Sequence, residues 1–183
     1  FFLVTTTMNV DSGISKKLSE KPPPDYKPPI IKKKNIFEVI INKNGQLFAD
    51  EELVEVSQLR EKAMSFLDNG GAPSGTPDYC NYCQGARNTS SSDNPSKAII
   101  SLKNDRETPY GTYITVQNEI VGAYNDLRNR EAQRLYKRDF TAMEAAYLNP
   151  ETAESLKDDL KEKVKNIQDL FPQKFSEAET SNN

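Results

Sequence analysis

The 183-residue sequence contains no His and no Trp, only two Cys, and no apolar run of the ~20 residues that a membrane span requires. The absence of His excludes imidazole-based catalytic triads, His-ligated zinc and His-ligated haem. Two Cys cannot fill a tetrahedral zinc site by themselves. The chain also shows no paired carboxylates, no nucleophile beside a base and no glycine-rich phosphate loop. We therefore expect a protein that is not an enzyme, with no catalytic residue, no metal and no cofactor.

The composition is polar for a globular chain. Hydrophobic residues make up 36% and charged residues 28%, and the mean hydropathy is -0.74. This length is enough for one domain, with part of the chain outside it. The net charge of -3 does not favour a nucleic-acid surface.

The sequence begins with Phe1-Phe2-Leu3-Val4 rather than with Met. It lacks the basic segment and the cleavage site of a signal peptide. One interpretation of residues 1–8 is the end of a transmembrane helix whose upstream part is missing. A short buried strand or a disordered end fits the same pattern, and periodicity alone leaves these alternatives open.

Residues 9–35 are interpreted as a linker. Residues 1–34 hold seven Lys and three acidic residues, whereas the rest of the chain holds 17 basic and 24 acidic residues. Proline blocks helices and ladder hydrogen bonds, so the segment should be extended, at ~3.1 Å per residue. A spacer between an anchor and a domain is favoured over a ligand for an aromatic-lined groove. The prolines concerned are Pro22, Pro23, Pro24, Pro28 and Pro29.

The pattern becomes that of a folded domain at residue 36. Strands are predicted at 36–42 and 46–49, because Asn44-Gly45 between two apolar runs is a strong hairpin signal. A helix should follow to residue 67, with Ser57 as its N-cap and an apolar stripe that packs on the sheet.

Residues 68–97 are rich in Gly, Pro, Ser and Asn and are predicted to form a long surface loop. The loop holds Cys80 and Cys83. A redox-active dithiol would need a helix after the first Cys, which the sequence does not predict, and a zinc site would need the same pair from a second chain. We favour a local disulfide that fixes the loop tip in an oxidising compartment.

The remaining elements are a strand at 98–103, a long helix after Pro109, a helix from Asn149-Pro150 to Leu170, and a short strand at 174–179. The apolar stripe of the long helix fades beyond Leu127, so we expect that helix to leave the domain surface or fray there. Residues 36–180 should form an α+β domain with a small mixed β-sheet and helices packed on one face. Residues 181–183 are a polar tail.

Four stretches resemble the ExbD/TolR family of biopolymer transport proteins, especially its Bacteroidetes-type members. They are residues 1–18, the hairpin at 39–47, the turn at 105–111 and the last strand at 174–179. The turn is the most specific, because Asp105-Arg106-Glu107-Thr108-Pro109-Tyr110-Gly111 is similar to the family's Asp-Lys-x-x-Pro-Tyr-Gly.

The resemblance implies an accessory subunit of a proton-driven motor in the cytoplasmic membrane. A single membrane helix would sit in an ExbB-type channel, and this chain would lie in the periplasm and engage a TonB-type coupling protein. The family's protonatable Asp would lie upstream of Phe1. The resemblance also implies a homodimer, which we expect to form through an exposed strand edge, and peptidoglycan as a further candidate partner.

Specific residues follow from the same resemblance. Asp105, Pro109, Tyr110 and Gly111 are expected at a partner contact. Ile14 and Leu18 are expected in a short strand that adds to the domain or to its partner.

Two other functions remain open from the sequence. One is a periplasmic module that binds the cell wall or a scaffold without any motor. The other is a dithiol protein that uses Cys80 and Cys83.

Overall fold

The computed structural model describes residues 31–180. The expectations for residues 1–8, for most of the linker, for Ile14 and Leu18 and for the tail at 181–183 lie outside the described residues.

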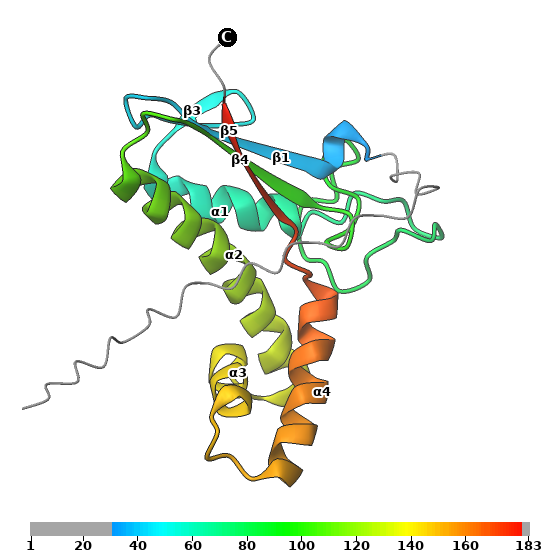
Figure 1. The fold of residues 1–183 in the computed structure, drawn as a ribbon. Helices are drawn as coiled ribbons and strands as arrows, with labels where there is room; N and C mark the ends of the chain where they lie inside the picture. Colours follow the sequence, from blue (N-terminus) through cyan, green and yellow to red (C-terminus); the bar gives the residue numbers. More distant parts are fainter. Residues whose placement is uncertain (1–30, 181–183) are drawn as a thin grey trace, which may run out of the picture. The chain divides into compact units, whose positions relative to one another are not determined.

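A mixed five-stranded sheet organises the domain, in the order β3-β2-β1-β4-β5 (Figure 1). The first three strands form an antiparallel meander, whereas β4 and β5 run parallel to β1. The α+β class and the mixed sheet predicted from the sequence are confirmed. A short 3-10 helix, η1 (Lys33–Asn35), precedes the strands, which are β1 (Ile36–Ile41), β2 (Leu47–Ala49), β3 (Glu52–Val54), β4 (Ile99–Asp105) and β5 (Phe175–Thr180).

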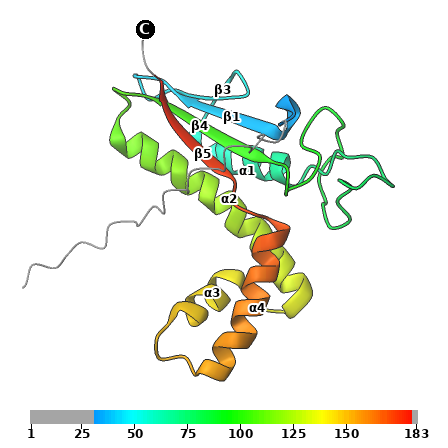
Figure 2. The ribbon, with the colours of Figure 1, turned by 45° about the vertical axis from the view of Figure 1, so that its right-hand side comes forward.

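Four helices accompany the sheet: α1 (Val56–Leu67), α2 (Tyr110–Tyr136), α3 (Phe140–Leu148) and α4 (Glu154–Leu170). Helix α1 and the first half of α2 pack side by side against one face of the sheet (Figure 1). The second half of α2 continues past the sheet and packs with α3 and α4, as Figure 2 also shows. We call residues 129–171 the helical lobe.

Each part of the domain has its own core. The main core lies between the sheet and helices α1 and α2, and β1 contributes Phe37, Val39 and Ile41, which alternate along the strand as one buried face requires. The core of the helical lobe contains Ala132, Phe140, Met143, Leu160, Val164 and Ile167.

Beyond Leu127 the long helix leaves the sheet, which is one of the two outcomes expected from the sequence, and it does not fray. Helix α2 runs on for nine residues after Leu127, and its buried positions there include the charged Arg128 and Glu131 beside the apolar Ala132. Arg128 Nε donates to the carbonyl of Phe171 at 3.0 Å, and the fully buried Glu131 carboxylate pairs with Arg130 and Arg134. This part of the helix resembles a solvated surface in the sequence because two of its buried side chains are charged, and their polar groups are satisfied by partners that the local sequence does not reveal.

Two predicted helix starts are wrong. Ser57 lies inside α1, whose N-cap is Glu55, and the Gln58 side chain accepts a hydrogen bond from the Glu55 backbone N–H at 3.1 Å. Helix α4 begins at Glu154 rather than at Asn149-Pro150. Asn149 instead ends α3, where its side chain accepts from the backbone N–H of Glu151 and closes a turn.

Residues 68–97 contain no helix or strand, and much of the loop lies at the surface, as predicted. Its two ends and its disulfide are buried, which the sequence did not indicate. Asn69 holds it together: its side-chain amide donates to the carbonyls of Asn88 and Ser92 at 2.8 and 2.7 Å, and its side-chain oxygen accepts from the Asn88 N–H at 3.0 Å. The polar residues that suggested solvent exposure therefore satisfy the loop's own backbone.

Asp93 joins this loop to the start of the domain. Its buried carboxylate contacts Lys34 at 2.5 Å and Lys32 at 3.2 Å, and it accepts from the Asn35 side chain at 3.2 Å. Burial acts to raise the pKa of Asp93, but the hydrogen bonds from Lys34, Lys32 and Asn35 outweigh it and hold the pKa below its usual value.

Replacing Asp93 by Asn should lower the free energy of unfolding by about 2 kcal/mol at pH 7, because charge-assisted hydrogen bonds are lost. The pKa of Asp93 is lower in the folded chain than in the unfolded one, so its contribution is present above pH ~4 and is lost as the pH falls further. Urea unfolding at pH 7 and pH 3 should thus show a difference between Asp93→Asn and wild type that shrinks at pH 3. Asp78→Asn, which alters an exposed pair with Lys97, is the control and should change little at either pH.

Candidate functional site

The turn between β4 and α2 is shaped by its own polar residues. Asp105 ends β4, and its side-chain oxygen accepts from the backbone N–H of Glu107 at 2.9 Å. The carbonyl of Asp105 accepts from the N–H of Thr108 at 3.0 Å. This Asx-turn places Pro109 at the N-cap of α2, where a missing N–H costs nothing.

The hairpin between β1 and β2 packs against this turn. Asn42 organises the hairpin, since its side-chain oxygen accepts from the backbone N–H groups of Asn44 and Gln46 at 3.0 and 2.9 Å. Gly45 has a φ of 75°, and a Cβ at that position would lie 3.8 Å from the Pro109 ring. The Thr108 hydroxyl lies 3.3 Å from the carbonyl oxygen of Asn42, which ties the two turns together.

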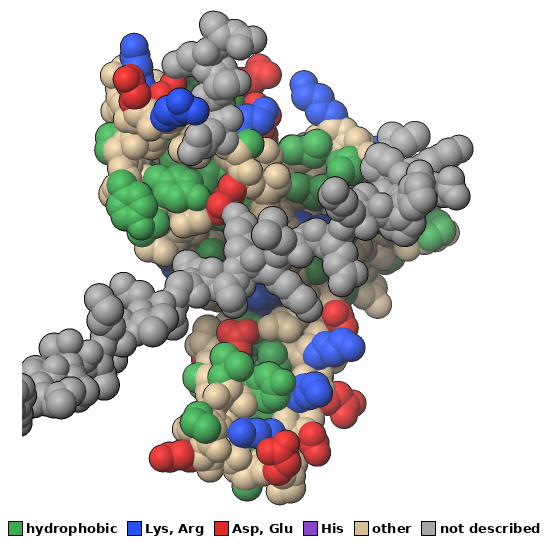
Figure 3. Space-filling view, viewed as in Figure 1, with side chains coloured by type: hydrophobic (Ala, Val, Ile, Leu, Met, Phe, Trp, Pro, Cys, Tyr) green, Lys and Arg blue, Asp and Glu red, His purple; other side chains and the backbone are tan. Residues whose placement is uncertain are grey.

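The joined turns present an exposed aromatic side chain. Tyr110, on the first turn of α2, is 77% exposed, and open space surrounds the position that a Cβ of Gly111 would occupy. Figure 3 shows hydrophobic side chains gathered over the N-terminal end of α2. An exposed tyrosine on a rigid turn is a good anchor for a partner protein, because it combines apolar area with a hydroxyl and loses little entropy on binding.

The start of α2 is fixed to β5 by a polar network. The Gln117 amide donates to the Tyr113 hydroxyl at 3.2 Å and also to the Glu177 carboxylate of β5. Burial raises the pKa of Tyr113, and Glu177 raises it further. The carboxyl ends of the parallel strands β1, β4 and β5 meet at this end of the sheet, so three elements distant in sequence support the same surface.

The structure brings Asp105, Pro109, Tyr110 and Gly111 together at one turn. Asp105 shapes the turn through its hydrogen bond to the backbone, whereas Tyr110 and Gly111 face solvent. Sequence reasoning missed Asn42 and Thr108, whose roles depend on contact between two turns.

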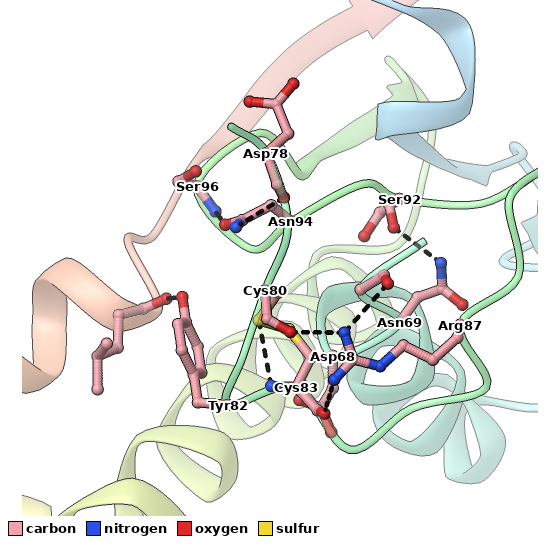
Figure 4. Close-up of a disulfide and its surroundings, with 12 residues drawn as sticks. Asp68, Asn69, Asp78, Cys80, Tyr82, Cys83, Arg87, Ser92, Asn94 and Ser96 are labelled. Carbon is pink, nitrogen blue, oxygen red and sulfur yellow. Dashed lines mark hydrogen bonds between the residues drawn. A yellow bond between two sulfur atoms is a disulfide. The ribbon is translucent and has the colours of Figure 1, made fainter. Parts of the chain in front are cut away.

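Cys80 and Cys83 are joined by a disulfide, with their Cα atoms 5.5 Å apart (Figure 4). Both are buried, with exposed fractions of 1% and 5%, so the pair lies inside the loop rather than at its tip. The Arg87 guanidinium donates to the carbonyls of Cys80 and Cys83 at 2.5 and 2.6 Å. No helix follows the first cysteine, so the thiolate-stabilising environment of a redox dithiol is missing here.

Tyr82, between the two cysteines, connects the loop to the helical lobe. Its hydroxyl donates to the carbonyl of Leu170 at 2.7 Å, and its ring packs edge-on against Phe171. Burial, together with nearby Glu131 and Asp68, raises the pKa of Tyr82 to about 12. The hydroxyl therefore stays protonated at neutral pH and remains a donor to the end of α4.

The described residues contain neither a cluster of three or more His, Cys, Asp or Glu that could hold a metal ion nor a helix long and apolar enough to cross a membrane. What they contain is an α+β domain that displays an exposed tyrosine, Tyr110, at one end of its sheet.

The comparison with protein families identifies its family. The model described as biopolymer transport protein ExbD/TolR matches residues 1–128, and the chain belongs to this family. Its role therefore lies in the energy-transduction systems of biopolymer transport. Members of the family are membrane-anchored accessory proteins with a periplasmic domain, and they work with ExbB- or TolQ-type membrane partners and TonB-like proteins. No curated protein matches the chain.

The family match ends at Arg128. It includes the hairpin, β4, the turn at 105–111 and the first part of α2. The helical lobe and β5 lie beyond the matched residues, although β5 completes the sheet.

Proposed function

We propose that this chain is the periplasmic part of an accessory subunit in a motor driven by the proton-motive force. An ExbB-type channel in the cytoplasmic membrane holds its single membrane helix, and an acidic residue N-terminal to Phe1 carries the proton. Motion of that helix passes through the Pro-rich linker to the folded domain, which works as a homodimer and acts on a TonB-type coupling protein. The chain performs no catalysis of its own.

The observation that carries this proposal is the turn at 105–111. It lies within the family-matched residues and displays Tyr110 at 77% exposure on a support built from β1, β2, β4 and α2. An exposed aromatic residue on such a rigid support fits the contact with the coupling protein.

A motor-independent wall-binding module would keep the same linker and domain, and no contact within the described residues favours it. A dithiol function is disfavoured by the burial of Cys80 and Cys83.

The test is site-specific photo-cross-linking in cells that carry the whole gene. A photoreactive amino acid at Tyr110 should capture the TonB-type protein, and a protonophore should reduce the yield several-fold. Tyr110→Ala should lower uptake through the outer membrane about tenfold or more, because hot-spot tyrosines contribute ~2 kcal/mol to binding. It should leave the melting temperature nearly unchanged.

Leu148 provides the matched control. It is 69% exposed but lies outside the family-matched residues, so Leu148→Ala should preserve uptake and a photoreactive group there should not capture the coupling protein. Normal uptake with Tyr110→Ala, or cross-links that do not respond to the protonophore, would contradict the proposed contact.

A further inference from the structure

The chain contains two Asn-Gly dipeptides, Asn44-Gly45 and Asn69-Gly70. In such a dipeptide the backbone nitrogen of the glycine can attack the side-chain carboxamide of the asparagine, and the glycine has no side chain to hinder the attack. Asparagine is accordingly one of the thermolabile residues of proteins. The local sequence does not separate the two dipeptides, so their reactivity depends on where the fold places each of them.

Asn44 lies at the exposed tip of the hairpin between β1 and β2. Its backbone N–H donates to the Asn42 side chain at 3.0 Å, but its own carboxamide has no hydrogen-bond partner among residues 31–180. The Gly45 N–H donates to the carbonyl of Asn42 at 3.0 Å, so this single bond of the turn must open before the Gly45 nitrogen can attack. The Asn44 carboxamide is free to rotate toward that nitrogen, and solvent surrounds the tip.

Asn69 has the opposite surroundings, inside the loop at 68–97 (Figure 4). It is 3% exposed, and its carboxamide makes three hydrogen bonds, to the carbonyls of Asn88 and Ser92 and from the Asn88 N–H. A Cβ at Gly70 would lie 2.7 Å from the Cβ of Cys83, so the backbone here is closely packed. Rotation of the Asn69 carboxamide would leave buried polar groups without partners, which is costly. The reaction at Asn69 therefore requires the loop to unfold.

We propose that Asn44 is a site of spontaneous deamidation and that the folded loop protects Asn69 from the same reaction. The Gly45 nitrogen gives up its proton to solvent and bonds to Cγ of Asn44. The Cγ–Nδ2 bond breaks, and the side-chain nitrogen takes up a proton and leaves as ammonia. One water molecule then opens the resulting succinimide. Cleavage of the new bond gives aspartate, and cleavage of the original peptide bond gives isoaspartate.

The two products differ in what they do to the hairpin. Both add a negative charge, but isoaspartate also lengthens the backbone by one carbon between Asn44 and Gly45. This segment packs closely against the start of α2, since a Cβ at Gly45 would lie 3.4 Å from the Thr112 hydroxyl oxygen and 3.8 Å from the Pro109 ring. An inserted carbon must displace one side of this contact. Isoaspartate should therefore loosen the support of the turn at 105–111, whereas aspartate should leave it in place.

Peptide mapping by mass spectrometry of the whole chain, incubated in mildly alkaline buffer, tests the site. In the folded chain the peptide with Asn44 should gain one mass unit at least about tenfold faster than the peptide with Asn69, because a hairpin tip opens at a lower free energy than a buried loop. In urea the two peptides should react at similar rates. Asn44→Gln should suppress the reaction at residue 44, because the larger ring forms slowly. If the two sites react equally in the folded chain, or Asn44 stays unmodified while both react in urea, the assignment is wrong.

Hydrogen exchange tests the effect on the hairpin. Anion exchange separates the modified chains by their added charge. In the isoaspartyl form the backbone N–H groups of Gly45 and Gln46, which bond to Asn42, should exchange several-fold faster than in the unmodified chain. Asn44→Asp is the matched control, because it adds the charge without the extra carbon, and its exchange should stay close to wild type. Equal acceleration in Asn44→Asp would contradict the role of the lengthened backbone. Neither measurement involves a partner protein, so both are independent of the proposed function.

Discussion

Replacing Arg130 by Leu should lower the free energy of unfolding by about 3 kcal/mol, one of the largest single-residue effects that we expect in this domain. Arg130 lies on α2 and donates two hydrogen bonds to the carboxylate of Asp68, at 2.6 and 2.9 Å. Its Nε also contacts the buried Glu131 at 3.1 Å. The Asp68 side chain is only 10% exposed, so removal of the guanidinium leaves a buried carboxylate without its main partner.

Arg134→Leu is the matched control for this prediction. Arg134 lies one turn further along α2 and also pairs with Glu131, but its side chain is half exposed and Glu131 keeps Arg130. Urea unfolding should show a loss below about 1 kcal/mol for the control. Equal losses in the two variants would contradict the central role given to the Asp68–Arg130 pair.

The Asp68–Arg130 pair also links the long loop at 68–97 to the helical lobe, the two parts of the domain that lie outside the sheet and helix α1. Asp68 is the first residue of the long loop, and Arg130 lies in the first turn of the helical lobe. Tyr82 and Phe171 make a second connection between the same two segments. The loop therefore braces the lobe against the sheet domain, and we expect Arg130→Leu to loosen the lobe first. Hydrogen exchange in α3 and α4 should accelerate in this variant before exchange in β1 and β4 does.

The parts of the fold that could be predicted from the sequence have local signals. The hairpin at 36–49 is predicted because Asn-Gly lies between two apolar runs, and the last strand because residues 174–179 resemble the family's terminal strand. β3 was missed since it has only three residues and its central Leu53 faces outward. Its only support is pairing with β2, which no local pattern reveals.

The helical lobe was misjudged for a different reason. A core is expected to be apolar, but α2 buries Arg128, whose Nε donates to a backbone carbonyl, and Glu131, whose carboxylate pairs with two arginines. The partners come from the far end of α4 and from the same helix, so the sequence around residue 130 resembles an ordinary solvated surface.

In the candidate site, too, features with a local sequence signal could be predicted, whereas contacts between distant residues could not. The motif at 105–111 could be found from the sequence through its resemblance to the family, and Asp105 makes the short-range turn that its position suggests. Its support by Asn42 and Thr108 depends on two turns more than 60 residues apart, so it could be seen only in the structure.

Replacing Gly71 by Ala should destabilise the domain by about 3 kcal/mol, because overpacking here meets backbone rather than a flexible side chain. A Cβ at Gly71 would lie 2.2 Å from the carbonyl oxygen of Asn88 and 2.7 Å from the Asn69 amide nitrogen. The backbone at Gly71 or the backbone at Asn88 must therefore move. That movement breaks the hydrogen bond from the Gly71 N–H to the carbonyl of Ser92. Thermal unfolding measures the loss directly.

Gly111→Ala should do the opposite and stabilise the domain by up to about 1 kcal/mol, because alanine favours the helix and its Cβ would meet open space. The two substitutions add the same methyl group, so their difference isolates the packing of the loop from any general effect of glycine. A Gly71→Ala variant as stable as wild type would show that the loop is loosely packed. The bracing of the helical lobe through Tyr82 and Asp68 would then lose its rigid support, and the hydrogen-exchange order expected for Arg130→Leu should disappear with it.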